Sequence, residues 1–520
     1  MSSLFSSFND YLPFHAARRG DKPMMKDDRK DLSFGEVHAH VERIAAALQR
    51  DGLKKGDRIA ILAKNSVDNL SVFMGCARAG VIPVGVNYRL APGEVAYIAA
   101  DAGVKKLFLD AEFAPLCEGC GELPRVMLDG DGDGPSLAQW CEGAGQASAV
   151  TIAGDDILFH MYTSGTTGHP KGVLISHGNV LLNSYQSPMS TGIWPCEEDR
   201  SLVIAPTFHA VGLVGAMLGV IYGSSMVIHR DYDPVGMIET LANERITTVA
   251  VIPVMLQFSL AMVPDMSGYD FSALKTINYG GSPISESLLR QCIEVFDCDF
   301  VQGYGQTEAT MALTFLTAGD HRRALAGQPG LLRSCGRAVF GTELKIVNTE
   351  GQECVPGEVG EVLARGPQLM QGYWQRPEAT AETIVDGWLH TGDAGIFDDD
   401  GYLYIQDRVK DMIISGGENI YPAEIENLLM SHPDIADVAV IGRADERWGE
   451  VPMAVVVKGG ESLPSIDELV TFCHGRIANF KIPKHIHEVP ALPRNPSGKI
   501  LKKDLRAQLA NVDHSETAQA

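Results

Sequence analysis

Short apolar runs rich in β-branched residues alternate along this chain with longer stretches that place apolar side chains on one helical face. Buried strands are predicted at residues 58–62, 81–86, 105–109, 157–162, 202–205, 226–229, 248–252 and 276–279. Helices are predicted around residues 37–48, 68–79, 235–244 and 286–296, the first of them after a capping-box spacing from Ser33 to Glu36. This alternation is typical of an α/β fold with mainly parallel sheets covered by helices.

The pattern changes after about residue 330. Runs rich in Gly, Glu and Val at 341–347 and 357–364 predict a small β-rich subdomain. A new compact pattern follows from about residue 411, with helices predicted at 423–431 and 466–478 and strands at 438–441 and 454–457. That segment is long enough for a separate α+β domain with its own core. We therefore expect a large N-terminal domain over 1–407, a joint at 408–411 and a small C-terminal domain over 412–520.

One stretch raises the question of a membrane span. No Asp, Glu, Lys or Arg lies between Arg200 and Arg230, and Gly215, Gly219 and Gly223 have the spacing of packed transmembrane helices. The uninterrupted apolar part, 210–223, is shorter than the roughly 20 residues that cross a bilayer. A buried strand, loop and helix is therefore expected at 200–230, with no transmembrane segment. The N-terminal residues lack a charged region followed by an apolar one, so no cleaved secretory signal is expected.

Composition narrows the class of protein. The chain has 43 Lys and Arg against 66 Asp and Glu, a net charge of −23, which argues against nucleic-acid binding as a main activity. Its 10 Cys have no repeated spacing, which indicates a reduced, cytoplasmic chain. Cys117 and Cys120 lack a second pair at metal spacing. The run 129–134 imitates a calcium loop but has Trp140 at the twelfth position, so a solvated linker is expected.

The segment 163–172 carries the first chemical signal. It follows a predicted strand and combines glycines, hydroxyl side chains and a lysine: Thr163, Ser164, Gly165, Thr166, Thr167, Gly168 and Lys171. Backbone amides, hydroxyls and a positive charge suit an anionic polyphosphate, although the spacing is not that of a Walker A loop. An ordinary turn seldom combines these groups, so a phosphate loop is the preferred interpretation.

This loop resembles the phosphate loop of the adenylate-forming superfamily, which contains acyl-CoA synthetases, luciferases and carrier-protein adenylation domains. The superfamily's other motifs follow in order at 208–209, 279–283, 303–308, 391–393, 407–413, 415–422 and 495–500. Together they span nearly the whole chain, which most resembles bacterial fatty-acyl-CoA synthetases. One departure is His169, where many relatives have a basic or amide residue.

The resemblance implies a reaction in two steps. The acid's carboxylate attacks the α-phosphate of ATP, which gives an acyl adenylate and pyrophosphate. The thiol of CoA then attacks the activated carbonyl, and AMP leaves. Lys499 resembles the family's catalytic lysine, which bridges the carboxylate and the α-phosphate, whereas Lys502 and Lys503 fit a solvated tail better.

The resemblance also assigns the nucleotide site. Its residues outside the phosphate loop are Gly281, Ser282, Tyr304, Gly305, Thr307, Asp393 and Arg408. Tyr304 offers a flat face to adenine, the Thr307 hydroxyl can donate to the α-phosphate, and Asp393 with Arg408 suits the ribose. Glu308 closes the same motif as Thr307, and a carboxylate beside phosphates suits Mg²⁺.

Three further assignments concern the second step. Lys410 matches the hinge about which the small domain rotates between the half-reactions, a motion that a few backbone torsions can carry. Gly416 and Gly417 match the lining of the thiol tunnel, where the missing side chains let the narrow pantetheine arm of CoA approach the backbone closely. His209 matches a residue between the acyl site and the thiol entrance, where a gating role is preferred over a purely structural one.

We therefore expect an ATP-dependent acid–CoA ligase that acts on a medium- or long-chain fatty acid. Its expected partners are small molecules, and a homodimer is the common default for such a chain. An aryl or alicyclic acid, or a carrier protein in place of CoA, remains an alternative. A luciferase-like oxygenase and a non-catalytic nucleotide-binding protein are weaker ones; the presence of Lys499 and Glu308 argues against the latter.

Overall fold

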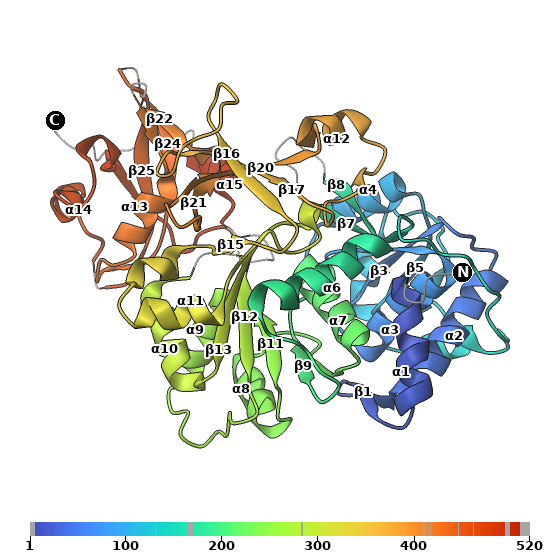
Figure 1. The fold of residues 1–520 in the computed structure, drawn as a ribbon. Helices are drawn as coiled ribbons and strands as arrows, with labels where there is room; N and C mark the ends of the chain where they lie inside the picture. The colour runs from blue at the N-terminus through green and yellow to red at the C-terminus, as the bar shows by residue number, and fades with distance from the viewer. Residues whose placement is uncertain are drawn as a thin grey trace. The chain divides into compact units, whose positions relative to one another are not determined.

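The computed structural model describes residues 6–130, 132–163, 170–281, 284–408, 411–415, 418–445, 447–460, 462–494 and 500–509. The chain divides into two compact units (Figure 1). Unit 1 comprises Met1–Glu343 and Ala364–Leu389, and unit 2 comprises Leu344–Leu363 and His390–Ala520.

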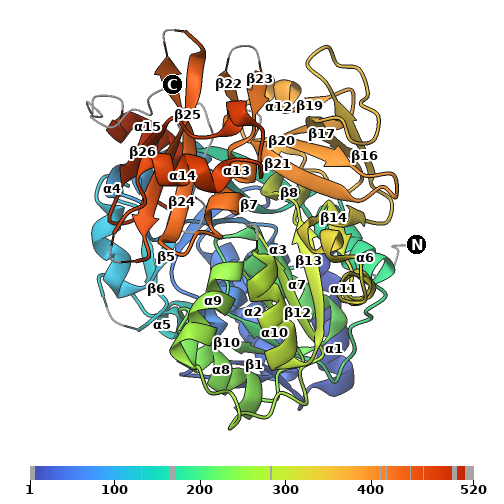
Figure 2. The same ribbon diagram turned by 90° about the vertical axis from the view of Figure 1, so that its left-hand side faces the viewer.

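The first sheet of unit 1 has nine strands in the order β15-β14-β13-β12-β11-β9-β10-β1-β2. Its strands β9 to β13 pair in parallel. They are β9 (Arg200–Val203), β10 (Ser225–Ile228), β11 (Thr248–Val251), β12 (Thr276–Gly280) and β13 (Asp299–Tyr304), beside β1 (Pro23–Lys26), β2 (Asp31–Ser33), β14 (Thr314–Leu316) and β15 (Arg337–Ala338). Helices connect the parallel strands, as Figure 2 shows: α7 (Ala210–Tyr222), α8 (Pro234–Asn243), α9 (Pro253–Met262) and α10 (Glu286–Phe296).

The second sheet of unit 1 has seven strands in the order β18-β8-β7-β4-β3-β5-β6. They are β3 (Arg58–Leu62), β4 (Ile82–Gly85), β5 (Val104–Leu109), β6 (Arg125–Met127), β7 (Ile157–Thr163), β8 (Lys171–Ser176) and β18 (Gly372–Tyr373). The predicted capping box is confirmed at the start of α2 (Phe34–Arg50), where the Ser33 hydroxyl accepts from the Glu36 amide and the Glu36 carboxylate accepts from the Ser33 amide. A single core cluster contains Ile44 of α2, Phe73 of α3 (Val67–Ala79), Val214 of α7 and residues of both sheets.

The other helices of unit 1 lie around these sheets. They are α1 (Tyr11–Arg19), α4 (Pro92–Ala102), α5 (Leu137–Cys141), α6 (His177–Thr191), α11 (Ala318–Leu325) and α12 (Pro377–Thr383). The prediction for 200–230 is confirmed, because β9 is followed by a turn and then by α7. Two of the three spaced glycines have local structural roles: a Cβ on Gly219 would lie 2.9 Å from Met226 Sδ, and Gly223 ends the helix at φ +73°. Among the described residues, no helix is both long and apolar enough to cross a bilayer.

Unit 2 contains a β-rich part and an α+β part. It groups the two together, whereas the sequence pattern predicted that the first, β-rich part belongs to the N-terminal domain over 1–407. The first holds β16 (Glu343–Val347), β17 (Gly360–Arg365), β20 (Trp388–Phe397) and β21 (Leu403–Arg408), with β19 (Ile384–Val385) beside β20. The second holds β22 (Ile413–Ser415), β23 (Glu418–Ile420), β24 (Ile435–Asp445), β25 (Gly449–Lys458), β26 (His485–Glu488), α13 (Pro422–Leu429), α14 (Ile466–Cys473) and α15 (Lys502–Leu509). Helix α14 ends before the predicted residue 478, and Gly475 adopts a positive φ just beyond it.

Candidate functional site

The predicted site residues of unit 1 follow the carboxyl ends of parallel strands. His209 comes after β9, Gly281 after β12, and Gly305 to Glu308 after β13, whose last residue is Tyr304. Carboxyl ends of parallel strands meet at one edge of a sheet, which is where open α/β sheets bind ligands. The strand order therefore places segments that are about 100 residues apart in sequence along one edge.

The phosphate loop is anchored by the hairpin of β7 and β8. Thr163 and Lys171 lie directly opposite each other in this antiparallel pair. The loop thus begins and ends at one rung of the ladder, which brings a hydroxyl and a cation to its base. The intervening Ser164, Gly165, Thr166, Thr167 and Gly168 lie outside the described residues.

Glu308 is buried at the base of the same loop. It lies in a short 3₁₀ helix, Thr307–Ala309, and its residue is 9% exposed. Its Oε1 accepts a hydrogen bond of 2.9 Å from the Tyr373 hydroxyl and one of 3.5 Å from the Thr163 hydroxyl. Two predicted groups, Thr163 and Glu308, are thus brought together, and a third residue joins them.

That third residue, Tyr373, was missed by sequence reasoning. It belongs to β18, which pairs with β8, and its amide donates to Thr380 Oγ1. Lys171 Nζ lies 4.9 Å from the centroid of its ring, a cation–π distance. Burial and the neighbouring Glu308 carboxylate raise the pKa of Tyr373, so the hydroxyl stays protonated and can donate. Its sequence signal was weak: an aromatic pair, Tyr373-Trp374, after a glycine.

The turn after β13 is held in an unusual conformation. Gly305 has no room for a side chain, because a Cβ there would lie 2.1 Å from the Met311 carbonyl oxygen. Thr310 adopts φ +64°, which is rare for a β-branched residue, and its hydroxyl donates to the Gln368 carbonyl at 2.7 Å. The turn that carries Glu308 is therefore fixed by tertiary contacts.

His209 is positioned by contacts with the second sheet. It is the N-cap residue of α7 and follows Phe208, which is buried. The side chain of Asn65, just after β3, donates to the Ala205 carbonyl at 3.0 Å and accepts from the Thr207 amide at 2.9 Å. These two hydrogen bonds, which we call the Asn65 clasp, fix the backbone immediately before His209.

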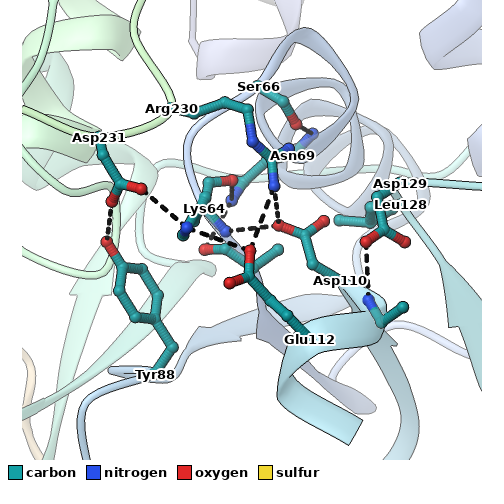
Figure 3. Close-up of polar contacts among 12 residues, drawn as sticks. Lys64, Ser66, Asn69, Tyr88, Asp110, Glu112, Leu128, Asp129, Arg230 and Asp231 are labelled. Carbon is teal, nitrogen blue, oxygen red and sulfur yellow. Dashed lines mark hydrogen bonds and ion pairs between the residues drawn. The ribbon is translucent and has the colours of Figure 1, made fainter.

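Tyr88 packs against the same segment. Its ring stacks on Phe113 with centroids 4.7 Å apart and meets Phe208 edge-on at 5.0 Å. Its hydroxyl donates to Asp231 Oδ1 at 3.1 Å, as Figure 3 shows. Asn65 and Tyr88 thus hold the Phe208–His209 segment by two independent sets of contacts. Neither residue was singled out from the sequence, because nothing local marks them.

A network of charges links the carboxyl ends of the two sheets (Figure 3). Arg230, after β10, donates to Asp110 Oδ2 after β5, and Lys64, after β3, pairs with Glu112 and Asp231. Asp110 is fully buried, and burial raises its pKa despite the bond from the Lys64 amide and the charge of Arg230. The hydrogen bond that the Lys64 ammonium donates to Asp231 raises the pKa of Lys64. These ion pairs and hydrogen bonds hold in place the loops that carry Asn65 and Tyr88.

The run 129–134 corrects one expectation. Asp129 is not part of a purely solvated linker, because its Oδ2 accepts from the Ala111 amide at 2.8 Å. Cys117 and Cys120 are free thiols. Among the described residues, no group of three or more His, Cys, Asp or Glu side chains is arranged to share a metal ion.

Unit 2 carries a second group of predicted residues. Asp393 of β20 is buried and lies opposite Arg408 of β21 in the antiparallel ladder. The backbone amide of Asp393 donates to Thr391 Oγ1, whose hydroxyl donates to the Val362 carbonyl. The ladder therefore fixes the position of Asp393 and brings the two predicted ribose residues side by side.

Lys502 is not the solvated tail residue expected from the sequence. Its side chain is 10% exposed and pairs with Glu426 at 2.9 Å and Asp407 at 3.5 Å. These carboxylates raise the pKa of Lys502 although burial alone would lower it. Asp407 also accepts from the Ala423 amide. Ser282, Lys410, Gly416, Gly417 and Lys499 lie outside the described residues.

The donors around Glu308 fit a magnesium ion. Mg²⁺ prefers oxygen ligands and is commonly held by one or two carboxylates together with substrate phosphates. The Glu308 carboxylate lies beside the hydroxyl of Thr163, at the base of the phosphate loop. Glu308 is the residue that would hold the ion.

Most of the chain matches two family models of AMP-binding enzymes. A family model described as AMP-binding enzyme matches residues 12–374, and another, AMP-binding enzyme C-terminal domain, matches 424–499. A fatty acid–[acyl-carrier-protein] ligase, ScoC, of Streptomyces coeruleorubidus is 39% identical over 95% of this chain and 94% of its own. A feruloyl-CoA synthase of an Amycolatopsis species is 38% identical over 91% of this chain and 93% of its own. The structure of o-succinylbenzoate coenzyme A synthetase (MenE) from Bacillus subtilis in complex with ATP and magnesium ion has a TM-score of 0.84, 31% identity, and coverage of 95% and 99%.

Proposed function

The chain belongs to the AMP-binding enzyme family and is an AMP-forming acid–CoA ligase, and we propose that its acid is a medium- or long-chain fatty acid. The enzyme first converts the acid and ATP to an acyl adenylate and pyrophosphate. It then transfers the acyl group to the CoA thiol and releases AMP. The observation that carries the reaction with ATP is the cluster of Thr163, Lys171, Glu308 and Tyr373 at the phosphate loop.

In the first half-reaction the protein's task is alignment and charge neutralisation. Thr163 and Lys171 present a hydroxyl and a cation to the phosphates, and Thr307 donates to the α-phosphate. Lys499 bridges the carboxylate and the α-phosphate at the moment of attack. Glu308 would hold Mg²⁺, which when bound would supply positive charge beside the phosphates. Tyr373 holds the Glu308 carboxylate in place.

The same proposal assigns the remaining groups. Tyr304 stacks on adenine, and Asp393 with Arg408 binds the ribose. Rotation at Lys410 replaces Lys499 by Gly416 and Gly417, which line the path of the thiol. His209 gates the passage from that path to the acyl group.

The acyl class is inferred from α7. This helix follows His209 and has no charged residue. A Cβ placed on Gly215 would meet no atom within 4 Å, whereas Gly212 and Gly219 are packed against neighbouring atoms. Open space beside an apolar helix suits a flexible alkyl chain, and ScoC, by its name, acts on a fatty acid. An aryl acid is the alternative, supported by the feruloyl-CoA synthase relative.

The thiol acceptor has an alternative as well. ScoC loads an acyl-carrier protein, so a carrier-bound pantetheine could replace free CoA in this chain. The two acceptors share the thiol arm and differ in what lies beyond it. A direct comparison of the two acceptors with one acid decides between them.

The test is a panel of straight-chain, aryl and alicyclic acids, each assayed with CoA and with a pantetheinylated carrier protein. Pyrophosphate release reports adenylation, and thioester formation reports transfer. We expect straight-chain acids with CoA to give the highest kcat/KM. A higher kcat/KM for aryl acids would overturn the acyl assignment, and transfer to the carrier alone would overturn the acceptor.

Two variants test the site itself. Lys499→Ala should abolish adenylation, by about 10²–10³-fold or more, while thioester formation from supplied acyl adenylate persists. Glu308→Gln removes the charge that holds Mg²⁺, so activity should fall strongly and recover in part at high Mg²⁺. Equal loss of both half-reactions in Lys499→Ala, or ordinary kinetics in Glu308→Gln, would contradict these assignments.

A further inference from the structure

Helix α6 presents an apolar face to solvent. The structure describes α6 throughout, and its exposed residues are Leu182, Tyr185 and Met189, at 39%, 50% and 50% exposure. Spacings of three and four residues place them on one face of the helix. A surface helix ordinarily turns charged or polar residues outward. Helix α6 reverses this arrangement, because its exposed residues are apolar or aromatic while the polar residues Asn183 and Gln186 are buried.

This face extends beyond the helix. Trp194, just after α6, is 64% exposed, and Phe340 is 62% exposed. The backbone of Phe340 is tied to α6, because its amide donates to Ser190 Oγ at 2.8 Å and its carbonyl accepts from Gln186 Nε2 at 2.9 Å. We call Leu182, Tyr185, Met189, Trp194 and Phe340 the α6 face.

The α6 face is large for a free surface. Aromatic side chains cover about 150–250 Å² each, so these five residues at their exposures present roughly 500 Å² of mainly apolar surface. That lies in the upper half of the range for the largest patch on a typical monomer, roughly 300–600 Å². It also supplies most of the roughly 800 Å² that each partner contributes to a standard interface.

Charge identifies the partner. Residues 177–196 contain no Asp, Glu, Lys or Arg, although 21% of the chain is charged. Two copies of a chain with net charge −23 repel each other over most of their surface, and a neutral face is where they can approach closely. A face without Lys or Arg is also poorly suited to an anionic membrane, because such membranes attract clusters of Lys and Arg.

We propose that the α6 face is the interface of a homodimer in which the same patch of each copy meets across a twofold axis. In such an isologous contact, apolar side chains meet apolar side chains without a second complementary surface. Tyr185 and Trp194, the large amphipathic residues of the patch, are of the kind that dominates binding energy at interfaces.

Analytical ultracentrifugation of the full chain over about 0.1–100 μM tests the proposal, since dimerisation depends on concentration. We expect twice the 56.1 kDa monomer mass at the upper end. Met189→Glu keeps a good helix former but places two buried, unpaired charges in the contact, so dissociation should become at least about 100-fold easier. Leu182→Glu is the second variant.

Met262→Glu is the matched control. Met262 is 63% exposed at the end of α9, outside the α6 face, and its replacement makes the same chemical change. Circular dichroism and thermal melting establish that each variant is folded. A dimer lost in both folded α6 variants and kept in Met262→Glu supports the proposal.

Three results would overturn it. The first is a wild-type chain that stays monomeric over the whole concentration range. If that monomeric chain floats with phosphatidylcholine vesicles, lipid covers the face instead of a second copy. The second is a dimer that is unaffected by both α6 variants. The third is a dimer that Met262→Glu weakens as much as Met189→Glu does.

Discussion

The Tyr373 hydroxyl donates a 2.9 Å hydrogen bond to the Glu308 carboxylate, although the two residues are 65 positions apart in sequence. The bond leaves the carboxylate facing the base of the phosphate loop in one orientation. Because the donor is buried and its pKa is raised, it stays protonated across the working pH range. A buried bond to a charged acceptor contributes about 1.5–3 kcal/mol.

Tyr373→Phe is therefore expected to weaken adenylation by about 10- to 100-fold, mainly by raising the Mg²⁺ concentration needed for half-maximal activity. Pyrophosphate exchange titrated with Mg²⁺ measures this. Tyr232→Phe is the control, since it removes a half-buried hydroxyl that donates to the Met255 carbonyl at another place in unit 1. An unchanged Mg²⁺ titration in Tyr373→Phe would contradict the positioning role.

Removal of the Asn65 clasp should affect the two half-reactions differently. In Asn65→Ala the Ala205 carbonyl and the Thr207 amide lose their partner, so the segment before His209 can shift. A small misplacement can cost about 10²-fold, and we expect thioester formation to fall by about 10- to 100-fold while adenylation changes little.

The double variant Asn65→Ala/His209→Ala separates positioning from a general loss of stability. If Asn65 acts through His209, the two effects on thioester formation will not add. Additive losses, or an equal fall in pyrophosphate exchange, would show that Asn65 acts in another way.

Gly215 is expected to set acyl length. Gly215→Leu should fill the open space beside α7 and reduce kcat/KM for long acids about 10- to 30-fold relative to short ones, at about 0.8 kcal/mol per methylene that loses its burial. Gly215→Ala is the matched control, which should stabilise the helix and leave the preference largely unchanged. A uniform loss across all chain lengths would argue against a pocket at this position.

Lys410→Pro tests the hinge. Proline fixes φ near −65° and removes the amide donor, so it should trap one arrangement of the small domain. We expect pyrophosphate exchange to persist and CoA-dependent turnover to fall by about 10²-fold or more. A folded variant with unimpaired overall turnover would exclude the hinge at this residue.

His160 is expected to make the fold sensitive to acid. It is fully buried on β7 with neither ring nitrogen hydrogen-bonded to a described residue, and burial lowers its pKa from 6.5 to about 3. The unfolded chain takes up a proton near pH 6.5 but the folded chain does not, so the free energy of unfolding falls as pH drops from 6.5 towards 3.

His160→Leu removes that titration and two unsatisfied polar atoms. Its melting temperature should equal or exceed that of the wild type at pH 7, and the difference should grow at pH 5. His38→Leu on α2, where the side chain is 34% exposed, is the control and should leave the pH dependence unchanged. A difference between His160→Leu and wild type that stays constant with pH would contradict this account.

The sequence by itself determined the elements and the order of the motifs. The capping box of Ser33 and Glu36 and the strand that ends just before Gly281 were readable because they depend on residues within a few positions of each other. The fold class followed from strand–helix alternation, and the reaction type followed from motifs that lie in order along one chain.

Tertiary structure alone decided which side chains meet. Periodicity reports how deeply a residue is buried but does not identify its partner, because the partner depends on the order of strands in the sheets. Tyr373 reaches Glu308 through the pairing of β18 with β8, and Asn65 reaches Thr207 because the carboxyl edges of two sheets face each other. For the same reason Lys502 is buried against Glu426, and α6, which buries Asn183 and Gln186, leaves Leu182, Tyr185 and Met189 uncovered within one copy of the chain.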